Sequence, residues 1–339
     1  MDGLIRERIY NPIVRDVYEE WCERGLLEET ESLIRDIPAD LVRPFEYSFT
    51  THVGKEKGLF VDLVGAEFGI DEEPRKALAL SADILWTLSL MIDDIEDRDI
   101  IRGNLETSWV KFGERETLNS AKLIFFKLLH FIENNTGSRK IAEGCIRYVN
   151  LGMRSLIEHR FMNLDTSEGV VISNYENRCD FHATYQLMAF SQEILRLRFT
   201  ERMKMIIAAL RYINQSGQLK NDLRNLADNS ENRQYTDLMQ GVPTIPLIQI
   251  YKSLDRRNAR YFRSLFGKPY LNQEERLFLM QAITDTQVTE KIGRRINDNY
   301  INALELLNSA LRPNTVSWFE RWIIYKNDRE SSFNLSHQL

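Results

Sequence analysis

Apolar side chains recur along this chain with the spacing of helices. From Tyr10 to Leu311, almost every segment places them at positions i, i+3, i+4 and i+7, and no window keeps the alternation of a β-strand. The pattern therefore predicts an all-α fold with helices of moderate length. Turn-forming residues predict breaks between these helices at 35–44, 69–74, 133–138, 165–174, 228–234, 241–246, 266–272 and 312–314.

The chain shows no sign of a domain boundary. No stretch is rich enough in Pro and Ser, or biased enough in charge, to act as an interdomain linker, and no repeat period is present. One helical domain over residues 1–339 is the simplest prediction. The C-terminal segment, about 313–339, is predicted to be either a lid over a cavity or a docked tail.

Composition and charge exclude several classes of partner. The formal net charge of −6 argues against nonspecific binding to nucleic acid or to acidic membranes, because both need a basic surface. The three cysteines are too far apart to suggest a disulfide framework or a zinc site. No signal-like N-terminus or membrane-spanning apolar run is apparent. We expect a cytoplasmic protein without a nucleic-acid partner or a transmembrane segment.

The segment "LMIDDIEDRDIIRG", residues 90–103, places acids directly behind an apolar run. On a helix, Trp86, Leu90, Asp93 and Asp97 share one stripe, so the acids continue the core face. Such segments are often solvated surface acids. Closely spaced carboxylates near an apolar core repel one another unless a cation is present, and Mg²⁺ favours one or two carboxylates together with water and phosphate oxygens. We therefore predict a magnesium site here.

A second polar cluster lies in "SGQLKNDLRNLADN", residues 216–229. Asn221, Asn225 and either Asp228 or Asn229 share one helix face. Alone, such residues are usually caps or solvated polar side chains. Together with the first cluster they suggest two helices that face each other across a bundle, hold Mg²⁺ and bind a diphosphate.

Three segments resemble the trans-isoprenyl diphosphate synthases, especially the geranylgeranyl diphosphate synthase branch. They are "SLMIDDIEDRDIIRGN", "FGERETLNSAKLIFF" and "GQLKNDLRNLADNSENRQYTDLMQGVPTIPLI", and the resemblance extends from about Thr51 to Tyr251. It implies an all-α isoprenoid synthase-type bundle around a deep apolar cavity, Mg²⁺ between two aspartate-rich motifs, and a homodimer. It also makes Asp93, Asp94 and Asp97 the first metal cluster.

Departures from that family argue against chain elongation with isopentenyl diphosphate. In "GKEKGLF", Gly58 stands where elongating members have the arginine of GKxxRP, and Arg102 alone remains of a paired arginine. His182 and Ala183 replace a Lys-Thr pair, and Val242 replaces a lysine after a glycine. Each change removes a charge-assisted contact to a diphosphate, which is costly to bind without partners.

The second motif also departs from the family. "NDLRN" resembles the start of the NDxxSxxxE metal motif of class I terpene synthases, which share the fold and use only the allylic diphosphate. The match is partial, since Asn225 replaces Ser or Thr and Asn229 replaces Glu. Arg178 is placed like the arginine that senses diphosphate in those enzymes, although a surface ion pair is an equal alternative.

We therefore predict a Mg²⁺-dependent class I terpene synthase that ionises an allylic prenyl diphosphate to a hydrocarbon or alcohol plus diphosphate. Leu88 and Ser89, just before the first motif, lack the bulky aromatics that shorten the pocket in farnesyl-producing relatives, so the resemblance favours a C15 to C20 substrate. Aromatic rings would stabilise the carbocation, although aromatics at helical spacing are more often plain core. The predicted residues are Asp93, Asp94, Asp97 and Asn221 for catalysis; Asp93, Asp97, Asn221, Asn225 and Asp228 for metal; Arg102, Arg178, Lys220 and Arg224 for diphosphate; and Trp86, Leu88, Ser89, Phe181 and Phe190 for the pocket.

Three alternatives stay open. The first is a prenyl diphosphate synthase that binds isopentenyl diphosphate with different residues. The second is a noncatalytic partner subunit, whose mark would be loss of the first acid cluster, yet Asp93, Asp94 and Asp97 are present. The third is an unrelated helical protein with acidic surface clusters, which would bind no diphosphate in a Mg²⁺-dependent way.

Overall fold

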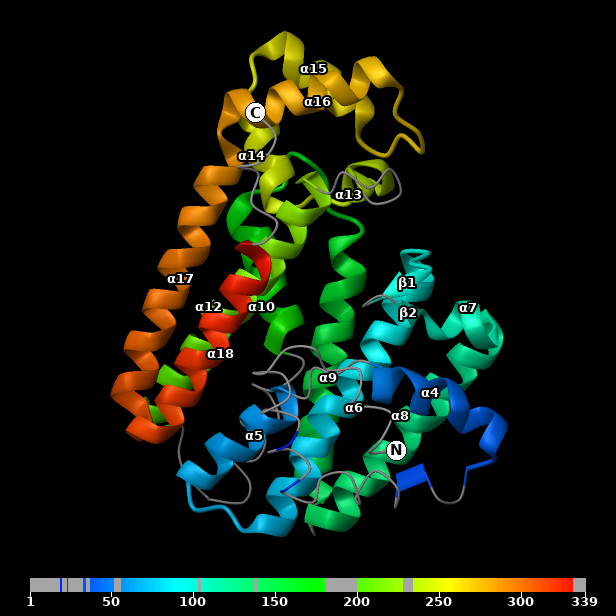
Figure 1. Cartoon of the computed structure of the whole chain (residues 1–339), viewed down its shortest axis with the longest axis vertical. Coiled ribbons are helices and arrows are strands. Elements are labelled where there is room, and N and C mark those ends of the chain that lie inside the picture. Colours follow the sequence, from blue (N-terminus) through cyan, green and yellow to red (C-terminus); the bar gives the residue numbers. More distant parts are fainter. Residues whose placement is uncertain are drawn as a thin grey trace. The chain divides into compact units, whose positions relative to one another are not determined.

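The computed structural model describes residues 33–34, 37–51, 56–102, 105–136, 139–180, 200–227 and 234–331, together with Glu19 and Glu23. Nearly all regular structure in this part of the chain is helical, which confirms the predicted all-α fold (Figure 1). The exception is a small antiparallel pair, β1 (Ile101–Arg102) and β2 (Leu105–Glu106), which the hydrophobic pattern did not predict. Within the described ranges, no helix has both the length and the apolar content needed to cross a bilayer.

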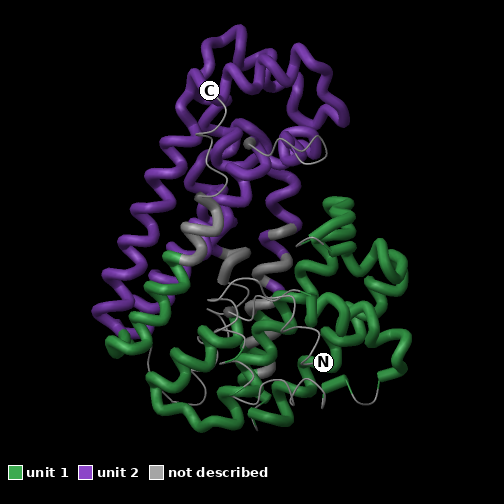
Figure 2. Tube along the Cα trace, viewed as in Figure 1, with its two compact units in different colours: residues 1–147, 182–200, 311–339 green, residues 148–181, 201–310 purple. Residues whose placement is uncertain are grey.

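The chain forms two compact units (Figure 2). Unit 1 contains residues 1–147, 182–200 and 311–339, and unit 2 contains residues 148–181 and 201–310. The prediction of one domain over the whole chain stays a prediction.

Unit 1 is organised around a long central helix. Its helices are α4 (Ala39–Thr51), α5 (Glu56–Glu67), α6 (Glu72–Glu96), α7 (Ser108–Phe112), α8 (Glu114–Thr136), the first part of α9 (Arg139–His159) and α18 (Pro313–Ser331). Every residue from Ala77 to Leu85 in α6 is buried, because α4, α5 and α8 all pack against this helix. This burial explains why the segment before the acids is almost continuously apolar.

One predicted break in unit 1 is shorter than the sequence indicated. The break at 35–44 ends early, because α4 begins at Ala39 and continues through Pro44. Proline removes one helical N–H donor, but Pro44 is buried together with Val42 and Phe45 on the packed face of α4. Burial of these apolar side chains offsets the missing hydrogen bond.

The C-terminal helix α18 lies against α5 within unit 1. The ring of Phe60 contacts Trp318, Phe319 and Trp322, with centroid distances of 5.1, 5.0 and 4.8 Å. At the start of α18, Thr315 Oγ1 donates to the buried carboxylate of Glu67 at 2.5 Å. These contacts anchor residues 313–324 to α5.

Unit 2 is built on two long helices that pack along each other. Its helices are the second part of α9, α10 (Glu168–Asp180), α12 (Glu201–Ala227), α13 (Thr236–Gln240), α14 (Ile245–Ser253), α15 (Arg256–Leu265), α16 (Gln273–Thr286) and α17 (Val288–Ala310). Helices α12 and α17 make the most extensive contact, in which Asn299 Nδ2 donates to Gln215 Oε1 at 3.2 Å. The predicted break at 266–272 is confirmed, because α15 ends at Leu265 and α16 begins at Gln273. The predicted break at 165–174 is too long, because α10 already begins at Glu168.

Candidate active site

The first acid cluster lies at the C-terminal end of α6. Asp93 and Asp97 are one turn apart and both partly exposed, and Asp97 N donates to Asp93 O at 2.8 Å. Asp94 lies between them in the sequence, and its side chain is 0% exposed. The cluster therefore presents two carboxylates outward and turns one inward. In the preceding turns Trp86 is partly buried and Leu88 is 4% exposed.

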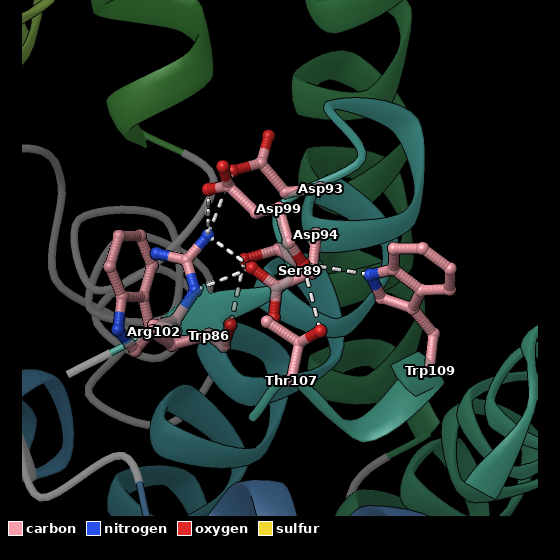
Figure 3. Close-up of polar contacts among 8 residues, drawn as sticks. All are labelled: Trp86, Ser89, Asp93, Asp94, Asp99, Arg102, Thr107 and Trp109. Carbon is pink, nitrogen blue, oxygen red and sulfur yellow. Dashed lines mark hydrogen bonds and ion pairs between the residues drawn. The ribbon is translucent and has the colours of Figure 1, made fainter. Parts of the chain in front are cut away.

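Arg102 lies among the carboxylates of this cluster (Figure 3). Its Nε donates to Asp94 Oδ1 at 2.6 Å, and its terminal nitrogen lies 3.5 Å from Asp93 Oδ2 and 3.8 Å from Asp99 Oδ2. Burial raises the pKa of Asp94 to about 6, although the positive charge of Arg102 opposes this increase. Asp94 Oδ2 is buried and accepts no hydrogen bond from the residues that the structure describes. The role of Arg102 as a diphosphate ligand stays a prediction.

The loop after α6 is fixed by hydrogen bonds of the Asp99 backbone. Asp99 O accepts from Thr107 Oγ1 and from Trp109 Nε1, both at 2.8 Å, and Asp99 N donates to Asp94 O at 2.9 Å (Figure 3). Arg98 adopts the left-handed backbone conformation with φ of 58°. These bonds position β1, which carries Arg102. Sequence periodicity held no signal for them, because they depend on the fold of the loop.

Arg102→Gln is expected to lower the stability of the metal-free protein by about 2 kcal/mol, because it leaves the buried Asp94 carboxylate without a cation. The loss should be smaller at pH 5 than at pH 8. A buried acid whose pKa is raised to about 6 is protonated below that pH and then needs no counter-charge. Thermal unfolding in EDTA at both pH values measures this effect.

The double variant Arg102→Gln/Asp94→Asn is the matched control, since it removes both charges and should recover most of the lost stability. If the double variant is as unstable as the sum of the single variants, the two side chains do not act as a pair.

The second polar cluster occupies the last turns of α12. Asn221 and Arg224 are exposed, and Lys220 Nζ lies 4.9 Å from the ring centroid of Tyr300 on α17. Asn225 Oδ1 accepts a hydrogen bond from Asp237 N at 3.1 Å, so this side chain connects α12 to α13. An amide oxygen has two lone pairs, so this hydrogen bond does not by itself exclude Asn225 as a metal ligand.

Asp222, next to Asn221 on α12, is a buried acid that the sequence analysis did not select. It is 1% exposed, and its carboxylate accepts from Tyr175 O–H at 2.7 Å and from Gln218 Nε2 at 2.9 Å. A signal was present, because Asp222 follows the buried Leu219 by three residues and precedes the buried Leu226 by four. This spacing places the acid on the core face of α12.

Several predicted residues cannot be placed. Asp228, Phe181, Phe190, His182 and Ala183 lie outside the described residues. Arg178 belongs to α10, but its side chain is outside the described part of the structure.

The exposed acids suit a metal ion that takes few protein ligands. Among the described residues, no group of three or more His, Cys, Asp or Glu side chains could hold a metal ion by itself. Asp93 and Asp97 supply two hard oxygen donors on consecutive turns, with both side chains partly exposed. Mg²⁺ accepts such a pair when water and phosphate oxygens complete its shell. The residues present therefore fit Mg²⁺, which stays a prediction.

Gly58 marks a close approach between α5 and α6. A Cβ atom at this position would lie 2.4 Å from Asp83 Oδ2 and 2.6 Å from the carbonyl oxygen of Ala79. The neighbouring Lys57 is 9% exposed, and its Nζ lies 5.2 Å from the ring centroid of Trp86. Any side chain at position 58 would therefore force the two helices or the Asp83 carboxylate to move.

Sequence comparisons place this chain beside enzymes that act on prenyl diphosphates. A family model described as polyprenyl synthetase matches residues 39–283. A geranylgeranyl pyrophosphate synthase from Rhodocybe pseudopiperita is 24% identical over 247 residues, which cover 67% of this chain and 68% of that protein. Preaspterpenacid I synthase from Aspergillus terreus is 23% identical over 291 residues, which cover 80% of this chain and 36% of that protein. The chain spans less than half the length of several curated relatives that it matches.

Solved structures share the fold. A polyprenyl synthase from Caulobacter crescentus, complexed with calcium and isoprenyl diphosphate, matches with a TM-score of 0.74 and 13% identity over 90% of this chain and 93% of that chain. A geranylgeranyl pyrophosphate synthase from Corynebacterium glutamicum, complexed with isoprenyl diphosphate and magnesium, matches with a TM-score of 0.67 and 15% identity over 92% and 97%. At these identities the likeness concerns the all-α fold.

Proposed function

The chain belongs to the polyprenyl synthetase family, and from this premise we propose that it is a class I terpene synthase. In this proposal it ionises one allylic prenyl diphosphate, of C15 to C20 length, and releases a terpene hydrocarbon or alcohol together with inorganic diphosphate. It does not condense that substrate with isopentenyl diphosphate.

The observation that carries this proposal is the packing at Gly58. Elongating enzymes, by the resemblance above, place there an arginine that binds the second diphosphate. In this chain the position lies against α6, where even a methyl group would come within 2.6 Å of Ala79 O. An arginine is therefore sterically excluded unless the two helices separate.

Other positions of the second diphosphate site lack charge as well. Val242 occupies the place of a lysine, and its backbone N–H donates to Asp237 O at 2.8 Å. Arg102, which alone remains of the arginine pair, contacts the Asp94 carboxylate. Removing these charge-assisted contacts weakens binding of a second diphosphate more than binding of the first.

In the proposed reaction, Asp93 and Asp97 on α6 would provide oxygen donors for Mg²⁺, and Asn221 and Asn225 on α12 are the further donors that the sequence motif suggests. The bound metal would neutralise the charge that develops on the leaving diphosphate. Arg102 keeps the buried Asp94 neutralised and thereby holds the end of α6 in place.

Further residues are proposed to contact the substrate. Lys220 and Arg224, next to Asn221 on α12, are the cationic partners of the diphosphate in this proposal. Trp86 is the proposed aromatic partner of the carbocation. Because Lys57 already lies over this ring, the carbocation would have to use the opposite ring face.

Gly58→Ala is expected to lower the stability of the protein by about 1–3 kcal/mol, because the new Cβ would overlap Asp83 Oδ2 and Ala79 O. Gly293→Ala on α17 is the matched control, since a Cβ there meets nothing within 4 Å. That helix-interior change should stabilise the protein by about 0.5–1 kcal/mol. Denaturant unfolding of both variants measures the difference, and a neutral Gly58→Ala would mean that an arginine is not excluded.

A prenyl diphosphate synthase is the second candidate, because geranylgeranyl pyrophosphate synthases are among the relatives of this chain. The two functions separate when purified protein is incubated with Mg²⁺ and C10, C15, C20 or C25 allylic diphosphates, with and without isopentenyl diphosphate. We expect a terpene hydrocarbon or alcohol from a C15 or C20 diphosphate alone. Longer diphosphates only in the presence of isopentenyl diphosphate would establish the second candidate, and no product in any mixture would indicate a noncatalytic subunit.

A further inference from the structure

Helix α15 of unit 2 and its flanking residues are locally basic in an acidic chain. Residues 251–270 contain six Lys and Arg side chains and one Asp, whereas the whole chain has a formal net charge of −6. Two of the six are paired, Arg263 with Asp165 and Lys268 with Glu275. The chain-wide charge, which argued against binding to acidic membranes, therefore conceals a local excess of positive charge.

The remaining arginines lie on the outer face of α15. This helix buries Phe262 and Leu265 and exposes Arg256, Arg257 and Arg260. Asp255, the helix cap, accepts hydrogen bonds from the backbone N–H groups of residues 257 and 258. Among the described residues, no carboxylate lies within ion-pair distance of Arg256 or Arg260.

This arrangement is electrostatically unfavourable for the isolated protein. Arg256 and Arg257 occupy the first turn of α15, where the helix dipole disfavours cations. Arg256 and Arg260 are one turn apart and repel each other. The Asp255 carboxylate at the N-terminus of α15 offsets the dipole effect, whereas an external anion would relieve the repulsion between Arg256 and Arg260.

Exposed apolar side chains accompany the arginines. Tyr261, Tyr270 and Leu277 are 40%, 69% and 56% exposed. The rings of Tyr261 on α15 and Phe278 on α16 are 4.7 Å apart, and both helices also contact α14, so the two helices lie side by side (Figure 1). We call Arg256, Arg257, Arg260, Tyr261, Tyr270 and Leu277 the α15–α16 surface. Glu274 is also exposed on α16, so the positive charge is concentrated on α15.

We propose that the α15–α16 surface binds a membrane surface that contains anionic phospholipid. The arginines contact lipid phosphates, while the tyrosines and Leu277 enter the boundary between headgroups and acyl chains, as amphipathic surfaces do. The exposed apolar residues favour lipid over nucleic acid, because a phosphodiester backbone offers them no apolar partner. The binding is peripheral, since no helix among the described residues is long and apolar enough to cross a membrane.

The advantage that membrane binding would give this protein rests on the proposed function. A prenyl diphosphate with a C15 to C20 chain is itself an amphiphile that partitions into bilayers, so membrane binding brings the enzyme to its substrate. Within unit 2, Gly267 N at the end of α15 donates to Leu238 O of α13 at 2.8 Å, and Asn225 joins α13 to α12. The residue that follows α15 is thus linked through α13 to α12, the helix that carries the second polar cluster.

Vesicle flotation of the full chain in EDTA, without substrate, tests the proposal. We expect binding to phosphatidylcholine vesicles that contain phosphatidylglycerol, little binding to phosphatidylcholine alone, and weaker binding as salt increases. Arg256→Glu/Arg260→Glu should bind the anionic vesicles more than about tenfold more weakly. Lys122→Glu/Arg321→Glu, which makes the same charge change at exposed positions in unit 1, should bind like the wild type.

The double variant Tyr270→Ser/Leu277→Ser tests how much the apolar side chains contribute to vesicle binding, separately from the arginines. This variant should bind anionic vesicles more weakly but keep the salt dependence of the wild type. Circular dichroism of every variant excludes unfolding. Equal binding to both vesicle types, equal loss in the control pair, or tighter binding to duplex DNA than to anionic vesicles would overturn the proposal. Because no substrate is present, failure here leaves the proposed reaction intact, and failure of that reaction leaves vesicle binding measurable.

Discussion

Asp93→Ala and Asp97→Ala are each expected to lower kcat by several orders of magnitude and to leave the helical fold intact. Both side chains are partly exposed at the end of α6, so their loss creates no cavity. Each would remove a proposed oxygen donor from the metal that carries the leaving-group charge. Steady-state turnover with a C15 or C20 diphosphate, together with circular dichroism, measures the two effects separately.

The matched control is Asp298→Ala, which removes an exposed helical aspartate from α17. It should retain wild-type turnover. Asp94→Ala is not a suitable probe of metal binding, because Asp94 is buried against Arg102 and its loss disturbs the fold. Wild-type turnover in both Asp93→Ala and Asp97→Ala would refute their assignment as metal ligands.

Asn221→Ala is expected to lower turnover by about 100-fold or more, because the exposed face of α12 offers few other oxygen donors. Asn302→Ala removes an exposed asparagine from α17 and should leave turnover unchanged. The KM for Mg²⁺ should rise in the first variant only. Full activity of Asn221→Ala would contradict the terpene-synthase interpretation of "NDLRN".

A test of Asp222 as a metal ligand needs a different substitution from the alanine used at Asn221. Because its carboxylate is buried and accepts from Tyr175 O–H, Asp222→Ala would destabilise the protein whatever its role in catalysis. Asp222→Asn keeps the shape of the side chain. If this variant is as stable as the wild type but inactive while Asn221→Ala is active, the metal ligand on α12 is Asp222.

Helix positions were predictable where the chain itself carries both the periodicity and the stop signals. The boundary at 266–272 agrees with the structure because Gly267 adopts φ of 81° and Asn272 forms a capping box with Glu275. The break at 35–44 was predicted too long because Pro44 was taken as a helix breaker. Its tolerance depends on burial against neighbouring helices, which a single sequence does not show.

Within the candidate site, only the local spacing of the residues was predictable from the sequence. The i, i+4 spacing placed Asp93 and Asp97 on one side of a helix, and the structure agrees. Spacing could not reveal that Asp222 accepts a hydrogen bond from Tyr175, because 47 residues separate them and only tertiary packing brings them together. Likewise, the sequence identified glycine at position 58, but the obstruction by Asp83 and Ala79 appears only when α5 packs on α6.

The central claim is that this enzyme uses one diphosphate substrate rather than two. Titration calorimetry with Mg²⁺ and an unreactive thio-analogue of a C15 or C20 allylic diphosphate tests it most directly, followed by injection of isopentenyl diphosphate into the saturated complex. We predict one tight site for the analogue, no further heat from isopentenyl diphosphate, and no incorporation of labelled isopentenyl diphosphate in a parallel reaction with the natural substrate. Micromolar binding of isopentenyl diphosphate and its stoichiometric conversion into a diphosphate five carbons longer would contradict the claim.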